Sequence, residues 1–132
     1  MSDTFDIAGF TSLFMGLFAI AAAIGEWRRP GLWQKMVAEI GASPALQLLT
    51  AFAEVALGAV IYLANPWDPP DTLSCLMNAI GGLMVLEGLV IAAFADRWLA
   101  LVTRMTAPLM RLWVGLAVIL GLALIVAAIP RF

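Results

Sequence analysis

Four stretches of mostly apolar residues follow one another along the chain, separated by short stretches that hold most of the charged residues. Each apolar stretch has about twenty residues, which as a helix rise about 30 Å and match the hydrocarbon thickness of a bilayer. The pattern predicts an all-α integral membrane protein with a single domain. The four predicted transmembrane helices cover residues 7–25, 44–64, 73–95 and 108–128.

Two of the connecting stretches, residues 31–41 and 97–107, are too short and too polar to span. In each of them the apolar residues recur at helical spacing and face away from the charged residues. Amphipathic helices of this kind lie in the headgroup layer. We therefore expect two similar hairpins, each with a short interfacial helix between its two spans.

The basic residues indicate the orientation. Six of the seven lysines and arginines belong to the first and third connectors, whereas the second connector is acidic: Arg28, Arg29, Lys35, Arg97, Arg104 and Arg111. Cytoplasmic loops carry the excess of positive charge. We expect these connectors in the cytoplasm and both termini in the periplasm of a bacterial inner membrane. The leading residues are acidic, so the first apolar stretch is interpreted as a retained span and not a signal peptide.

The amino-acid composition argues against several classes of function. Of the 132 residues, 64% are hydrophobic and 12% are charged, about half the charged share of a soluble domain. There is no histidine and only one cysteine, Cys75, so the commonest metal ligand and general base and any internal disulfide are absent. No enzyme motif, nucleic-acid-binding pattern, metal site or cofactor site is expected.

Two carboxylates lie deep inside the predicted spans. Glu54 is about 15 Å and Glu87 about 13–14 Å from the same predicted membrane surface, counting along each helix. At that depth two close carboxyl groups are expected to be neutral or to share one proton. Gln47 and Asn78 are candidate hydrogen-bond partners. The pair is either a proton or cation site or a hydrogen-bonded contact between helices.

Small residues at helical spacing form a stripe on the first span and recur on the others. Such residues let the backbones of membrane helices approach closely. The expected helix-packing residues are Gly9, Ser12, Gly16, Ala19, Ala23, Gly58, Gly81, Gly82, Gly88, Ala117 and Gly121.

Tryptophans and basic residues flank the predicted spans. They can hold anionic lipid headgroups, or they are ordinary interfacial anchors. The candidates are Trp27, Trp33, Trp98, Arg28, Arg29, Lys35, Arg97 and Arg104.

The two halves share one plan, which suggests an internal repeat. Residues 15–17 and 87–89 are similar, Pro44 corresponds to Pro108, and Gly58 corresponds to Gly121. Both copies would have the same orientation, related by an axis along the membrane normal.

The second half resembles the YjeT-like family of very small bacterial inner-membrane proteins. The matching residues are Leu86 to Leu89, Trp98, Met105, Arg111 and Gly115–Leu116, within about 45 residues of sequence. The family is a two-span unit of unassigned function, so the resemblance implies a membrane hairpin and no mechanism. This chain differs by having two such units.

The first half resembles the DoxX-like four-span proteins. The matching residues are Pro30, Gly41, Pro44, Glu54 and Gly58, and the third span departs from the family pattern. The resemblance implies a link to redox and thiosulfate metabolism, which a bound quinone or other redox group would support.

Three functions remain open. We favour a non-catalytic accessory subunit that packs against a larger membrane protein complex and contacts lipids. The first alternative is a small transporter or channel, oligomeric and coupled to protons or cations, that uses Glu54 and Glu87. The second is a redox-linked subunit of the DoxX-like kind.

Overall fold

The computed structural model describes residues 6–104 and 107–132, and this part of the chain is helical without any strand. The helices are α1 (Ile7–Arg28), α2 (Leu32–Ala42), α3 (Pro44–Ala64), α4 (Thr72–Thr103), α5 (Ala107–Ala128) and the short 3-10 helix η1 (Ile129–Arg131). Helices α1, α3, α4 and α5 are long and apolar enough to cross a membrane. The predicted all-α class with four possible spans is confirmed.

Local sequence sets where the helices begin. The Oγ of Ser43 accepts a hydrogen bond from the backbone N–H of Leu46, and Pro44 occupies the first turn of α3. This is a favourable start, because a proline has no N–H that would lack a partner there. Asp6 caps α1 and Asp71 caps α4 in the same way, through the backbone N–H groups of Gly9 and Ser74.

The long helices pack in two pairs, α1 with α5 and α3 with α4. Among the described residues, the first span does not pack along the second, nor the third along the fourth. The expected hairpins are therefore not the packed units. Glycines provide the reason, because Gly16 lies against Gly121 and Gly58 lies against Gly81.

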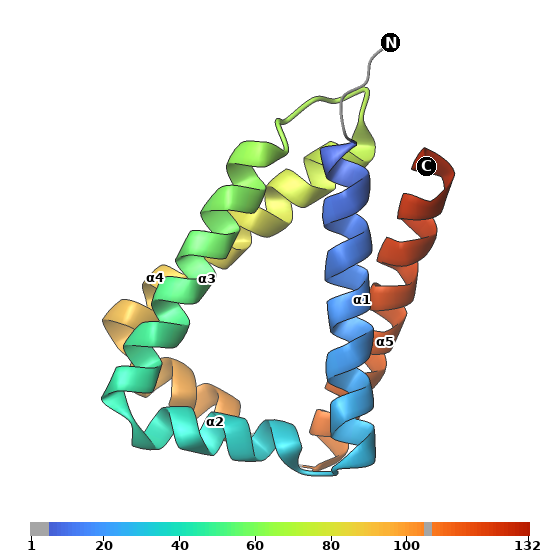
Figure 1. Cartoon of the computed structure of the whole chain (residues 1–132). Coiled ribbons are helices and arrows are strands. Elements are labelled where there is room, and N and C mark those ends of the chain that lie inside the picture. The colour runs from blue at the N-terminus through green and yellow to red at the C-terminus, as the bar shows by residue number, and fades with distance from the viewer. Residues whose placement is uncertain (1–5, 105–106) are drawn as a thin grey trace.

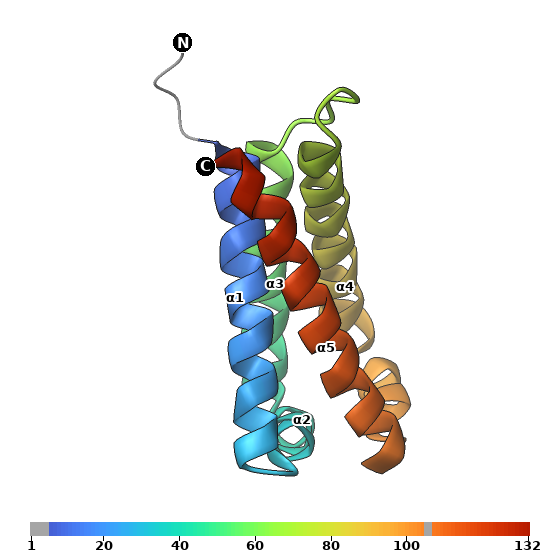
Figure 2. The same ribbon diagram turned by 90° about the vertical axis from the view of Figure 1, so that its right-hand side faces the viewer.

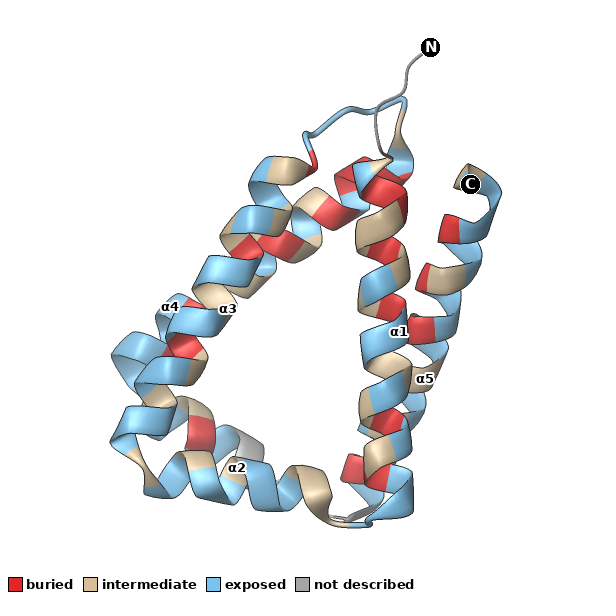
Figure 3. Cartoon of the chain, viewed as in Figure 1, coloured by how far each residue is buried: buried red, intermediate tan, exposed pale blue. Residues whose placement is uncertain are grey.

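The two pairs meet at the end of the molecule that holds both termini and diverge toward the other end (Figure 1). A cluster of buried apolar side chains joins all four long helices where they meet: Ala8, Leu73, Met77 and Leu124, with Met15, Ile61 and Ile80 packed against it. A view turned by 90° shows α1 in front of α3, and α5 running obliquely from beside α1 toward the last part of α4 (Figure 2). Buried residues concentrate along the two contact seams and at the meeting end (Figure 3). The fold is a wedge of two helix pairs.

The wide end of the wedge is crossed by α2 and by the last part of α4. Helix α4 bends at Phe94, where φ is −135° and ψ is 44°. The part of α4 after Phe94, up to Thr103, covers the described portion of the short helix predicted over 97–107. It follows the long part of α4 without a loop, since no glycine or proline occurs between Gly88 and Pro108. Met105 lies outside the described residues.

Candidate functional site

The two acids of the predicted spans are brought together. The Glu54 carboxyl on α3 lies within hydrogen-bonding reach of the Glu87 carboxyl on α4. Close packing beside them sets this proximity, because Gly88 lies against the backbone of Ala51 and against Val55. Glu54 is half-buried, whereas Glu87 is exposed within the folded chain.

Glu87 also lines a cavity of about 380 Å³ at the wide end of the wedge. Three elements contribute to its wall, and three of its seven described lining residues are tryptophans. They are Trp33 and Val37 of α2, Glu87, Trp98 and Leu101 of α4, and Met110 and Trp113 of α5. The bend at Phe94 helps to form the site, since it redirects the part of α4 that carries Trp98 and Leu101.

Trp33 is held firmly in the wall of this cavity. Its indole Nε1–H donates to the backbone oxygen of Ala22 at 3.1 Å, and its backbone N–H donates to the Glu26 carboxylate at 2.9 Å. The other Glu26 oxygen accepts from the N–H of Gly31 at 2.8 Å. Gly31 has a φ of +93°, a conformation that glycine adopts readily. The buried Glu26 therefore fixes both the start of α2 and the place of Trp33.

The predicted polar helpers of the acids have other partners. The side-chain amide of Gln47 donates to the carbonyls of Ile40 and Gly41, at the end of α2. That of Asn78 donates to the carbonyls of Tyr62 and Asn65, at the end of α3. The last carbonyls of a helix lack partners within that helix, which explains why they attract these donors. In these hydrogen bonds Gln47 and Asn78 donate to carbonyls at helix ends and not, as expected, to the two acids.

The small residues predicted for packing lie at the helix contacts. A Cβ built on Gly16 would be 2.7 Å from the Gly121 oxygen, and one built on Gly81 would be 2.7 Å from the Gly58 oxygen. Ser12 is fully buried, and its Oγ donates to the Leu124 carbonyl at 2.7 Å. Four other predicted residues occupy less central places: Gly9 lies beside Asp6 and Phe132, Gly82 lies beside the Tyr62 ring, and Ala19 and Ala117 are half-buried.

The two pairs share a crossing geometry in a register that differs from the sequence repeat. Gly16 contacts Gly121 and Ile125 as Gly81 contacts Gly58 and Tyr62. The contacts thus match Gly16 with Gly81, and not with Gly88 as the sequence pattern suggested. The physical reason for this match is that in each pair the two helices cross where the backbones of two glycines touch. A duplicated origin stays a prediction.

In this register the acids have no counterparts. Six residues after the matched glycines Gly16 and Gly81 stand Ala22 in α1 and Glu87 in α4. Four residues before the other matched glycines stand Ala117 in α5 and Glu54 in α3. Packing of such a pair is therefore possible with alanines at both positions.

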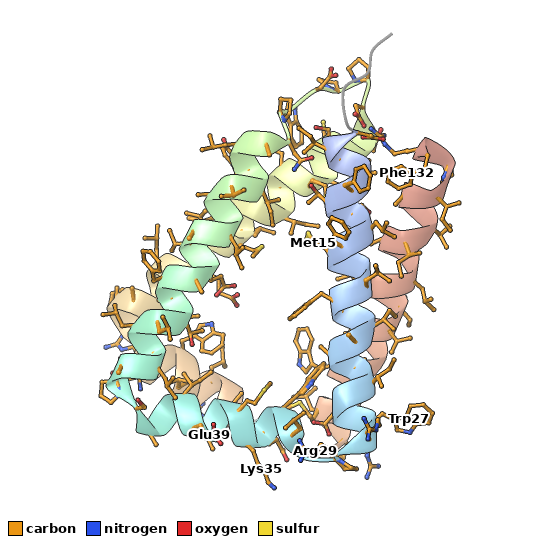
Figure 4. All side chains as sticks on the ribbon, in the orientation of Figure 1. Met15, Trp27, Arg29, Lys35, Glu39 and Phe132 are labelled. Carbon is orange, nitrogen blue, oxygen red and sulfur yellow. The ribbon has the colours of Figure 1, made fainter. Side chains whose placement is uncertain are left out.

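The candidate interface residues fall into two groups. Figure 4 shows Trp27, Arg29 and Lys35 pointing away from the space between the pairs, and the Trp27 side chain is 80% exposed. The remaining predicted basic residues, Arg28, Arg97 and Arg104, are also exposed. In contrast, Trp33 and Trp98 face the cavity and are half-buried. Their position differs from that of simple surface anchors.

An ion-pair cluster at the end with the termini was not predicted. The Arg131 guanidinium donates to both carboxylate oxygens of Asp6, at 2.6 and 3.0 Å, and to both of Asp71, at 2.9 Å each. These hydrogen bonds lower the pKa of the Asp6 and Asp71 carboxyl groups below its ordinary value. We call Arg131, Asp6 and Asp71 the terminal clasp. The only sequence signal for the clasp was that Asp6 and Asp71 each stand just before an apolar run, where they can cap a helix.

Sequence reasoning also missed Glu26 and Trp113 as parts of the site. Glu26 resembled an ordinary helix-end charge, and Trp113 lies five residues inside a predicted span. Only the contact of distant elements assigns them to one place. Among residues 6–104 and 107–132, no three Asp, Glu, His or Cys side chains come together as a metal site.

Comparison with known proteins adds no relationship: no family model, no curated protein and no solved structure matches the chain. The resemblances to YjeT-like and DoxX-like proteins therefore stay predictions.

Proposed function

We propose that this protein moves protons or a small cation across a membrane through a site formed by Glu54 and Glu87. The observation that carries the proposal is the meeting of the two acids at the edge of a cavity between helices. An ionisable residue inside a membrane is costly, and such residues often mark an ion or substrate pathway. Two facing carboxyl groups can hold one proton and exchange it for a cation.

The comparison of the helix pairs also favours this function over a purely structural role. Alanines occupy the matching positions in the α1–α5 pair, so the crossing does not require acids. In the α3–α4 pair the acids stand beside Gly88, where the helices already pack closely. A group that packing does not need, and that costs free energy to place in lipid, is best explained by chemistry.

The membrane arrangement follows from the same picture. We propose that α2 lies along the cytoplasmic surface of a bacterial inner membrane and that both termini face the periplasm. The exposed basic residues Arg28, Arg29, Lys35, Arg97 and Arg104 gather at the wide end, which agrees with the positive-inside rule. The termini and the acidic turn between α3 and α4 lie at the other end (Figure 1).

The test is proton flux into liposomes that contain the purified protein and a trapped pH-sensitive dye. With a potassium diffusion potential as driving force, the intact protein should acidify the interior faster than empty liposomes do. The double variant Glu54→Gln/Glu87→Gln should lose this flux, because amides cannot exchange protons. Glu39→Gln is the matched control, since Glu39 points away from the space between the pairs (Figure 4). Equal flux in the double variant and the intact protein would overturn the proposal.

An accessory subunit is the second candidate function. The observation in its favour is that the two helix pairs share their core at one end only, which leaves apolar faces for another membrane protein. Native mass spectrometry after gentle extraction tests it. A fixed ratio with a larger complex favours the accessory role, whereas a single chain or a homo-oligomer favours the acid site.

A further inference from the structure

The cavity beside the acids has an unusual wall for a space between membrane helices. Three indole rings come from three different helices: Trp33 from α2, Trp98 from α4 and Trp113 from α5. The other apolar members are Val37, Leu101 and Met110, and Glu87 is the only ionisable group among the described lining residues. The wall therefore combines aromatic surface with one acidic group.

Charged groups of both signs lie near the cavity. Glu54 is a direct neighbour of Glu87, so a second carboxyl group lies close to this acidic lining residue. A neighbouring cavity of about 330 Å³ shares Met110 and contains Glu26 and Arg111 among its lining residues. The Glu26 carboxylate accepts hydrogen bonds from the backbone N–H groups of Gly31 and Trp33. Within the part of the chain that the structure describes, no basic residue lines the tryptophan cavity itself.

The tryptophan rings and the Glu87 carboxyl group of this wall both suit an organic cation, in which a positive charge is spread over apolar groups. The face of an indole ring is negative and binds organic cations, most strongly where water is excluded. A carboxylate supplies the counter-charge. A bare metal ion would instead need several oxygen ligands, and an anion would need cationic or N–H donors. The volume lies within the range of small-molecule sites.

We propose that this cavity binds a lipophilic organic cation, with its charge beside Glu87 and its apolar groups against Trp33, Trp98 and Trp113. The inference rests on the proposed function, since it names the class of cation that the acid pair would exchange for its proton. Glu26 acts as a positioning residue that holds Trp33 in the wall.

Binding is tested with two ions of nearly equal size and shape and opposite charge. Tetraphenylphosphonium and tetraphenylborate are titrated against the purified full chain in an uncharged maltoside detergent, by equilibrium dialysis and by quenching of tryptophan fluorescence. We expect saturable binding of tetraphenylphosphonium at least about tenfold tighter than that of tetraphenylborate, because only the cation matches Glu87 and the indole faces.

Variants assign the binding to this cavity. Glu87→Gln and Trp113→Leu should each weaken tetraphenylphosphonium binding about tenfold. The matched controls are Glu39→Gln and Trp67→Leu, since Trp67 lies in the turn between α3 and α4. Both controls should bind as the intact protein does. Trp113 is 46% exposed, so its replacement should leave the fold intact, which circular dichroism verifies.

Two results would overturn the inference: equal binding of both ions, or binding that Glu87→Gln leaves unchanged. Either would indicate simple partition into apolar surface. If tetraphenylphosphonium fails to bind while proton flux still depends on Glu54 and Glu87, the ligand class is wrong and the proposed function stands. If that flux is absent as well, both proposals fail.

Discussion

The α1–α5 and α3–α4 pairs cross in the same way and are held together by different means. Both use a glycine-to-glycine backbone approach, at Gly16 with Gly121 and at Gly58 with Gly81. The α1–α5 pair adds the buried hydrogen bond from Ser12 and a contact between the rings of Phe10 and Phe132, whose centroids are 4.7 Å apart. The α3–α4 pair has hydrogen bonds from the Asn78 amide to the carbonyls of Tyr62 and Asn65, and a short turn connects its helices.

The difference has a physical reason in chain connectivity. Helices α3 and α4 follow one another, so little entropy is lost when they come together. Helices α1 and α5 come from opposite ends of the chain, and closing that long loop costs more. The Ser12 hydrogen bond, the contact between Phe10 and Phe132 and the terminal clasp lie at the α1–α5 pair, where they offset part of this cost.

The largest expected effect is on the glycine crossings. Gly16→Leu and Gly81→Leu should each lower the free energy of unfolding by about 3 kcal/mol, because the new side chain would meet the backbone of the partner helix. The measurement is unfolding in sodium dodecyl sulfate, followed by tryptophan fluorescence. The control is Gly115→Leu, since a Cβ on Gly115 meets nothing within 4 Å. A loss at Gly115 as large as at Gly16 would contradict the shared crossing.

The terminal clasp should have an intermediate effect. Arg131→Gln removes charge-assisted bonds to Asp6 and Asp71, each at an N-terminal helix cap, and should cost about 2 kcal/mol of unfolding free energy. Arg29→Gln is the control, since Arg29 is exposed. Equal stability of the two variants would show that the clasp contributes nothing.

The effect of the clasp should also depend on pH. Hydrogen bonds from Arg131 lower the pKa of the Asp6 and Asp71 carboxyl groups from the ordinary value of 3.8. A lowered carboxyl pKa stabilises the fold fully above the ordinary value, and the stabilisation is lost as the pH falls through the lowered pKa. The difference between the intact protein and Arg131→Gln should therefore be constant near pH 7 and shrink below about pH 3. A difference that grows in acid would contradict this assignment.

The smallest effect on stability is expected for the acids. Glu54→Gln/Glu87→Gln should change the unfolding free energy by less than about 0.5 kcal/mol, since alanines suffice at the matching positions Ala117 and Ala22. The same detergent unfolding measures it. A large loss would instead show that the acids serve as a structural contact between α3 and α4.

The sequence alone determined the number and nature of the long helices. Runs of apolar residues have a length and composition sufficient to cross a bilayer, and caps such as Ser43–Pro44 are local signals. The depth of Glu54 and Glu87 along their helices also followed from counting residues. Such features depend on neighbours along the chain, so a single sequence is enough to read them.

The tertiary structure decided which helices pair and what lies beside the acids. Helical pattern shows that Gly16 is suited to close packing, but not that Gly121 is its partner. The cavity depends on the bend at Phe94 and on Trp113, and the terminal clasp unites residues from three distant places in the chain. Contacts of this kind arise only when the chain closes on itself, because their geometry depends on several helices at once.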